Sequence, residues 1–309
     1  MIRQYSKKFK KVERNQFYGS KEMVRCIIAD SVTELAEAVG PATDAHRRPF
    51  GGDLSRSAFY GREFRSFGEL AQATREPWED GMKVIRDMID QLKNIDLPQV
   101  TSRKRKMRWN DSDGDEVCVD RMRSGQDFWR RSERQPVKST QGTVTIVFDA
   151  ATSGQVSCDD MLWRGAAVLL LTKLLEDAGY RVDLWIADPG TGFYEQDSFI
   201  AANVKRTHQP LNLAAVIVSI SSWFYRIVIL HTLNLAQDLT PDSEAGGLRT
   251  DGVEPFIGEL TSDDNALIAH DIWSLRKAVE FISDAVKALE AGDLTTCKWA
   301  YAIDVDSKK

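Results

Sequence analysis

The sequence contains few of the residues on which metal and redox chemistry depends. Its 309 residues include four cysteines and four histidines, and no two cysteines form a C-x-x-C pair. Common zinc sites need clustered thiolates and imidazoles, so this scatter argues against a structural zinc ion. We expect the thiols to be reduced, as is usual in a cytoplasmic protein.

Motifs of well-known enzyme classes are absent as well. The chain has neither G-x-x-x-x-G-K-[ST], which cradles nucleotide phosphates, nor the G-x-S-x-G nucleophile turn. The four histidines are too widely spaced to indicate a Ser-His-Asp or Cys-His arrangement. We therefore predict a binding protein rather than an enzyme, and we assign no catalytic residue.

The sequence also lacks an uninterrupted apolar run of membrane-spanning length. The most apolar stretch, residues 213–235, is broken by Ser219, Arg226 and His231, which would be costly to place in hydrocarbon. The first 14 residues are basic, but no apolar core follows them as it would in a signal peptide. We expect no membrane partner.

Excess positive charge is lacking too, because the formal net charge is -5. A chain with this balance has no global attraction for nucleic acid, so any basic surface must be local. Three local segments combine lysine or arginine with aromatic residues, which can neutralise phosphates and stack on unpaired bases. We predict contacts to single-stranded nucleic acid from Lys7, Lys8, Lys10, Lys11, Arg103, Lys104, Arg105, Lys106, Arg108, Trp109, Arg130 and Arg131.

The alternative interpretation of these segments is that they are solvated loops. The basic run at 103–108 is followed by acidic residues at 111–116, which could balance its charge. No apolar period passes through this stretch. We assign residues 101–141 to a charged connector between two larger regions.

The region before the connector, residues 1–100, is predicted to be mainly helical and to begin with a basic arm. Ser31 and Glu34 have the spacing of a capping box, and so do Ser66 and Glu69. Apolar residues then recur at helical spacing between positions 82 and 92. These signals predict helices but say little about what the helices pack against.

The region after the connector, residues 142–309, carries the clearest pattern. A β-rich run at 143–148 ends at Asp149, and a short polar turn leads into a helix whose cap is Ser157 or Asp159. A second β-rich run follows at 181–186. Strand, helix and strand with short links predict a parallel βαβ unit and therefore an α/β domain.

This strand, the hydroxyl-rich turn and the long helix resemble the start of a von Willebrand A domain. The adhesion motif of that family is D-x-S-x-S; Asp149 matches its aspartate and Ser153 its second serine, while Ala151 replaces the first serine. The resemblance implies a Rossmann-type sheet flanked by helices. It also implies a Mg²⁺ site at Asp149 and Ser153, because hard cations prefer oxygen ligands. The alternative is that Asp149 only hydrogen-bonds within the turn.

The same domain is similar to von Willebrand A-like proteins of phages and other mobile elements, some of which are regarded as single-strand-binding accessories. By this fold-level analogy we predict a phage-encoded binding protein that also contacts a protein partner through the α/β domain. Oligomerisation is left open. Two alternatives remain: a metal-assisted adhesion, scaffold or virion assembly module, and a metal-dependent hydrolase. For the hydrolase, one carboxylate and one hydroxyl do not make a two-metal site.

Overall fold

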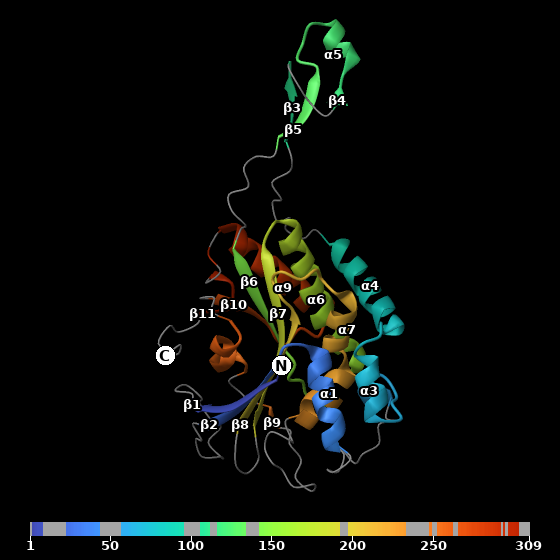
Figure 1. Cartoon of the computed structure of the whole chain (residues 1–309), viewed down its shortest axis with the longest axis vertical. Helices are drawn as coiled ribbons and strands as arrows, with labels where there is room; N and C mark the ends of the chain where they lie inside the picture. Colours follow the sequence, from blue (N-terminus) through green and yellow to red (C-terminus); the bar gives the residue numbers. More distant parts are fainter. Residues whose placement is uncertain are drawn as a thin grey trace.

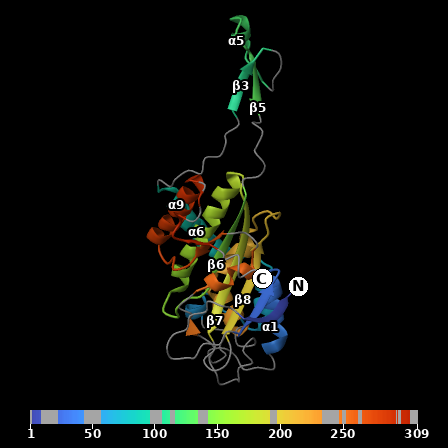
Figure 2. The same cartoon turned by 90° about the vertical axis from the view of Figure 1, so that its left-hand side faces the viewer.

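The computed structural model shows a main body and a smaller unit that projects from it (Figure 1). Figure 2, turned by 90°, shows the same separation along the longest axis of the molecule. The residues that the structure describes are 2–8, 23–43, 57–95, 106–111, 116–133, 142–191, 197–232, 247–248, 252–261, 265–291, 293 and 296–302.

The main body is built on a mixed sheet to which the described residues contribute eight strands. In spatial order these are β1 (Arg3–Lys8), β2 (Met23–Ala29), β8 (Asp197–Lys205), β7 (Arg181–Thr191), β6 (Thr143–Asp149), β10 (Asn265–Ala269) and β11 (Ala300–Ala302), with β9 (Gly247–Leu248) paired to β7. Strand β6 is parallel to both β7 and β10, whereas β8 is antiparallel to β7. The predicted α/β class and the parallel βαβ unit are confirmed.

Helices cover one face of this sheet, and a short 3-10 helix lies on the other (Figure 1). The helices are α1 (Val32–Thr43), α2 (Ser57–Tyr60), α3 (Phe67–Ala73), α4 (Glu79–Lys93), α6 (Cys158–Asp177), α7 (Leu213–Ile220), the π-helix η2 (Phe224–Ile229), the 3-10 helix η3 (Glu254–Glu259) and α9 (Leu275–Ala291). Helix α6 packs against α4, α7 and α9. It is therefore apolar on nearly all sides, as expected of a helix buried among neighbours.

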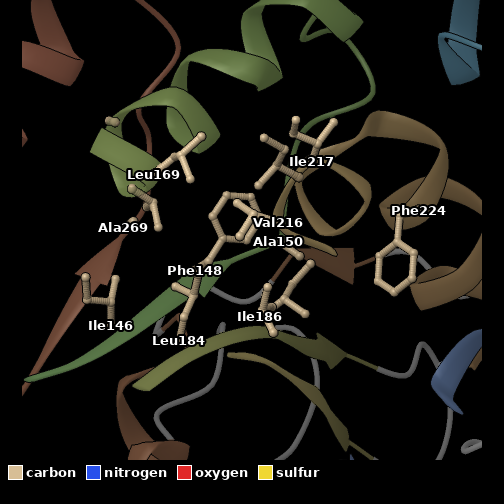
Figure 3. Packing of buried hydrophobic residues seen from close by; sticks show 14 of the residues in the cluster. Ile146, Phe148, Ala150, Leu169, Leu184, Ile186, Val216, Ile217, Phe224 and Ala269 are labelled. Atoms are coloured by element: carbon tan, nitrogen blue, oxygen red, sulfur yellow. The ribbon is translucent and has the colours of Figure 1, made fainter. Parts of the chain in front are cut away.

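Alternation along the central strands divides the core into two layers. Ile146 and Phe148 of β6 face the helical layer, while Val147 between them joins the layer under η3. Figure 3 shows Phe148 among Leu169, Val216 and other apolar side chains. Burial on both faces explains why β6 is a nearly continuous apolar run. The same packing fixes where β6 ends.

The N-terminal region contributes strands as well as the predicted helices. Both capping boxes form: the hydroxyls of Ser31 and Ser66 accept from the backbone N–H of Glu34 and Glu69 at 3.1 and 3.2 Å. Strands β1 and β2, however, extend the main sheet through parallel pairing of β2 with β8. The prediction of a mainly helical region missed them, because β1 is mostly polar and the short apolar pattern of β2 is interrupted by Arg25.

The charged connector contains a folded unit. Strands β3 (Lys106–Asn110), β5 (Trp129–Glu133) and β4 (Glu116–Val117) form a small antiparallel sheet in that order, and the five-residue helix α5 (Val119–Arg123) leads from β4 toward β5. We call residues 106–133 the projecting unit. Only β3 alternates, with Met107 and Trp109 between polar residues, and β5 is charged after Trp129, so the strand pattern of this unit is weak.

Among the described residues, no single helix has the length and apolar composition needed to cross a membrane. Helix α7 and the segment Phe224–Thr232 meet that criterion only as a pair, and they are bent by 62° at the break between them. The break lies at Ser221, the residue that ends α7.

Candidate functional site

Two places that include residues selected from the sequence combine charge with aromatic rings. The first is the projecting unit. Its register places Arg108 opposite Arg131 and Trp109 opposite Arg130. The strands β3 and β5 therefore bring residues 106–110 and 129–133 together, although they are separate in the sequence. Because side chains alternate along a strand, Trp109 and Arg130 share one surface of this sheet, while positions 108 and 131 share the opposite one.

Trp109 is the exposed centre of this surface. Its side chain is 38% exposed, and two arginines lie over its ring. The guanidinium carbon of Arg121 is 4.5 Å from the ring centroid and that of Arg130 is 5.8 Å away. Arg121 is held in place because its Nε donates to the backbone oxygen of Asp127 at 2.8 Å. Cation–π contacts of this kind order an exposed ring without burying it.

The projecting unit also exposes apolar side chains that a folded domain would normally bury. Of the five large hydrophobic residues exposed in the described part of the chain, four belong to this unit: Trp109, Val117, Val119 and Met122. Exposed apolar groups gathered in one place indicate a contact surface.

Charge also distinguishes residues 101–141 from the rest of the chain. Residues 101–141 contain 11 lysines and arginines against seven aspartates and glutamates, whereas the remaining residues contain 30 against 39. The positive excess of this segment lies in its two flanks, residues 101–105 and 134–141, because the projecting unit itself contains six lysines and arginines against seven aspartates and glutamates. An anionic polymer would be attracted to this segment and repelled by the rest.

The predicted N-terminal basic arm has a different setting. Lys7 belongs to β1, and its Nζ lies 2.6 Å from Oε1 of Glu259. The other carboxylate oxygen of Glu259, Oε2, accepts from the Tyr5 hydroxyl. Lys7 therefore ties the edge of the sheet to η3. Lys8 is the last residue of β1. The other candidates of the first two basic segments, Lys10, Lys11, Arg103, Lys104 and Arg105, lie outside the described residues.

The second place is the carboxyl end of β6, where Asp149 was predicted to lie. One oxygen of its carboxylate, Oδ1, accepts from the backbone N–H of Ala151 at 3.0 Å, which closes the turn that follows the strand. The hydroxyl of Thr152 donates to the carbonyl of Ala150 at 3.0 Å. Ser153 is exposed, and its Oγ accepts from the N–H of Gln155 at 3.3 Å. The turn is thus held by its own backbone and hydroxyl groups.

A buried arginine, which the sequence reasoning did not select, reaches this turn. Arg164 of α6 is 1% exposed. Its guanidinium donates to the carbonyls of Ala150 and Ala151 at 3.4 Å and to the hydroxyl of Thr152 at 3.2 Å. A signal was present: a charge inside a helix that is apolar on all sides has to be buried and needs partners.

Aromatic rings complete the surroundings of Arg164. The guanidinium carbon lies 4.4 Å from the centroid of Phe148 and 4.5 Å from that of Trp273. The Phe148 ring appears among the buried residues of Figure 3, in the layer covered by helices. A planar cation between two rings is desolvated, which strengthens the attraction between cation and ring.

Two buried acids share this end of the sheet. Burial raises the pKa of Asp149 to about 7, although the Arg164 guanidinium and the hydrogen bond from Ala151 lower it. Burial and the neighbouring Asp149 raise the pKa of Asp188 in β7 to about 8, and Arg164 again opposes the shift. Burial lowers the pKa of Arg164 to about 10, so the arginine stays charged at neutral pH. Oδ2 of Asp188 is buried without a hydrogen-bond partner.

The arrangement of this turn bears on the metal ion that the von Willebrand A resemblance implies. Mg²⁺ requires about six oxygen ligands in near-octahedral geometry. Here the carbonyls of the turn and the hydroxyl of Thr152 accept from Arg164, and Ser153 interacts within the turn. Within the described part of the chain, no group of three or more His, Cys, Asp or Glu side chains is placed to hold a metal. The oxygen donors around Asp149 therefore do not fit a resident Mg²⁺.

A family model described as a domain of unknown function (DUF7192) matches residues 7–269. No curated protein and no solved structure matches the chain. The matched range includes the projecting unit and most of the main body.

Proposed function

The chain belongs to this family of unknown function, and from that premise we propose that it is a binding protein whose projecting unit contacts single-stranded nucleic acid. The observation that carries the proposal is the exposed ring of Trp109 with Arg121 and Arg130 over it. Aromatic rings stack on bases, and arginines beside them neutralise phosphates.

Single strands suit this surface better than a duplex. The faces of the bases in a duplex are covered by their neighbours, so an exposed ring can stack only on bases that are free. The three-stranded sheet is also small, with strands of two to five residues. It offers a stacking platform for a few nucleotides rather than a helix that would fill a major groove.

The test is a titration of labelled single-stranded and duplex DNA, followed by fluorescence anisotropy at several salt concentrations. The key variant combines Arg121→Gln with Arg130→Gln, the two arginines that lie over the Trp109 ring. Each phosphate contact contributes about 0.7 to the slope of log affinity against log salt for single strands, so the variant should lower the slope by about 1.4. Wild type should prefer the single strand.

A matched control removes two positive charges from the main body, Lys83→Gln with Lys93→Gln on α4, where both lysines are exposed. This control should keep the wild-type slope. Equal losses in both double variants would mean that net charge alone governs binding. No binding of the wild type at low salt would leave the basic segments as solvated loops and remove the proposal.

For the main body we propose the finer assignment to a von Willebrand A-like fold. Two observations support it. Helix α6 connects the parallel strands β6 and β7, and Asp149 lies at the end of β6. A crystal structure whose strand order differs from that of von Willebrand A domains would contradict this assignment. The expected protein partner of this domain stays a prediction.

A further inference from the structure

We infer that the guanidinium of Arg164 is the resident cation of the acidic end of the sheet, and that it takes the place a divalent metal would occupy beside Asp149. The inference concerns the main body and is independent of what the projecting unit binds. It rests on what the guanidinium contacts, on the charges around it, and on the oxygen donors that it uses.

The contacts of Arg164 converge on one segment of the chain. The three acceptors of its guanidinium belong to the consecutive residues Ala150, Ala151 and Thr152. Arg164 lies on the seventh residue of α6, so the helix that follows the turn reaches back to hold it. A bound cation would hold such a turn by drawing the same oxygens together. The arginine performs this task with directional N–H donors instead.

The charges around Arg164 come from several elements. Asp149 ends β6, Asp188 lies in β7, Glu254 belongs to η3, and Asp271 follows β10; each influences the charge state of Arg164 or of Asp149. The Tyr225 hydroxyl of η2 donates to the carbonyl of Thr152 at 3.4 Å. Asp149, Asp188 and Asp271 therefore favour the charged form of Arg164, and the chain supplies this cation covalently.

The same arrangement disfavours a second cation. A divalent ion beside Asp149 would lie close to a guanidinium that is buried and charged, where repulsion is poorly screened. It would also have to replace the N–H groups that the turn oxygens already accept. Arg164 is packed between Phe148 and Trp273, so it has no solvated position to move to without losing both rings.

The first test asks whether the wild-type protein binds a divalent ion at all. Electron paramagnetic resonance with MnCl₂ measures free Mn²⁺, and thermal melting in MgCl₂ or in chelator measures any stabilisation. We expect wild type and Asp149→Asn to bind the same amount of Mn²⁺, so that no bound ion depends on Asp149. We also expect the wild-type melting temperature to be equal in MgCl₂ and in chelator. One bound Mn²⁺ per chain that is lost in Asp149→Asn would overturn the inference.

The second test separates charge from packing. Arg164→Met keeps an apolar chain between the rings but removes the cation, and the melting temperature should fall by about 5–10 °C because buried acids lose their partner. Adding Asp149→Asn, which keeps an oxygen for the N–H of Ala151, should restore part of this loss at pH 8. No restoration would mean that Arg164 acts only by packing, and the inference would fail.

The control for the rescue is Asp177→Asn at the exposed end of α6. It should restore nothing to Arg164→Met. If Arg164→Met does not fold, Arg164→Gln replaces it, because glutamine also removes the charge. The Mn²⁺ measurement on the wild type decides the inference in either case.

Discussion

The molecule uses arginine against aromatic rings in two settings that differ in their contact with water. On the projecting unit, Arg121 and Arg130 lie over Trp109, whose ring is more than one third exposed. At the end of β6, Arg164 lies between Phe148 and Trp273 with almost no exposure. The distances from guanidinium to ring are similar, but the first contacts are exposed to water and the second are buried.

The difference shows that geometry alone does not tell what such a contact does. An exposed pair contributes roughly 0.5–1 kcal/mol and leaves the ring available to a ligand. A desolvated arginine is costly to bury unless its N–H groups and its charge are matched, and once matched it fixes the structure around it. The first setting therefore suits binding, and the second suits architecture.

The largest effect expected from this comparison is on stability. Arg164→Ala should lower the free energy of unfolding by about 3–5 kcal/mol, because it leaves buried acids and turn carbonyls without their partner. Urea denaturation at neutral pH measures the loss. The control is Arg206→Ala, which removes a partly exposed arginine lying over the Trp185 ring. Similar losses in both variants would contradict the distinction drawn above.

The next effect is on affinity. Trp109→Ala should weaken binding to single-stranded DNA by about 1–3 kcal/mol, because one stacked base loses its ring. Trp109→Phe should retain most of the affinity. Anisotropy titration compares the three proteins, and circular dichroism checks that they fold alike. If the phenylalanine variant binds as weakly as the alanine variant, stacking is not the basis of binding.

A smaller effect should appear as a dependence of stability on pH. The pKa of Asp188 is about 8 in the folded protein, above the value of 3.8 expected when unfolded. The folded state therefore holds the proton more tightly, and wild-type stability should fall as pH rises from about 4 through 8. Asp188→Asn removes this loss. At pH 8.5, on the order of half a unit above that pKa, the free energy of unfolding of the variant should exceed that of the wild type by at least about 1 kcal/mol.

Urea unfolding of both proteins at pH 5 and at the higher pH measures this effect. Near pH 5 the carboxyl of Asp188 is protonated in the folded state, so the advantage of the variant should shrink there. An advantage of the same size at both pH values would mean that the gain is not electrostatic.

The smallest effect is expected on the projecting unit itself. Arg121→Ala removes one exposed cation–π contact and should weaken the unit by about 0.5–1 kcal/mol. Amide hydrogen exchange in β3 and β5 measures local opening, while exchange in β6 serves as the internal reference. Equal acceleration in β6 would show that the two regions do not behave as separate units.

Local signals in the sequence predicted much of the main body. Strand β6, helix α6 with its Ser157 cap, and strand β7 follow from a buried apolar run, a capping residue and a second run. Each of these signals lies within a few residues of the structure that it predicts. The position of Asp149 at a strand end followed in the same way.

Contacts between distant segments could not be predicted in this way. Arg164 meets the Asp149 turn only when α6 is in place, and two of its three acceptors are backbone carbonyls that no motif encodes. Asp188 reaches the same end of the sheet only through the pairing of β7 with β6. The projecting unit was missed because charge dominates its strands. Its pairing of Arg108 with Arg131 depends on a register that composition does not contain.

The pairing of β2 with β8 has a consequence for the order of events during synthesis. Val24 lies opposite Asp197, so about 170 residues must be made after β2 before its parallel neighbour exists. At roughly 5–20 residues per second, the ribosome needs on the order of ten seconds or more to supply it. During that interval β2 can pair with β1 alone, and the edge later covered by β8 is open to other chains.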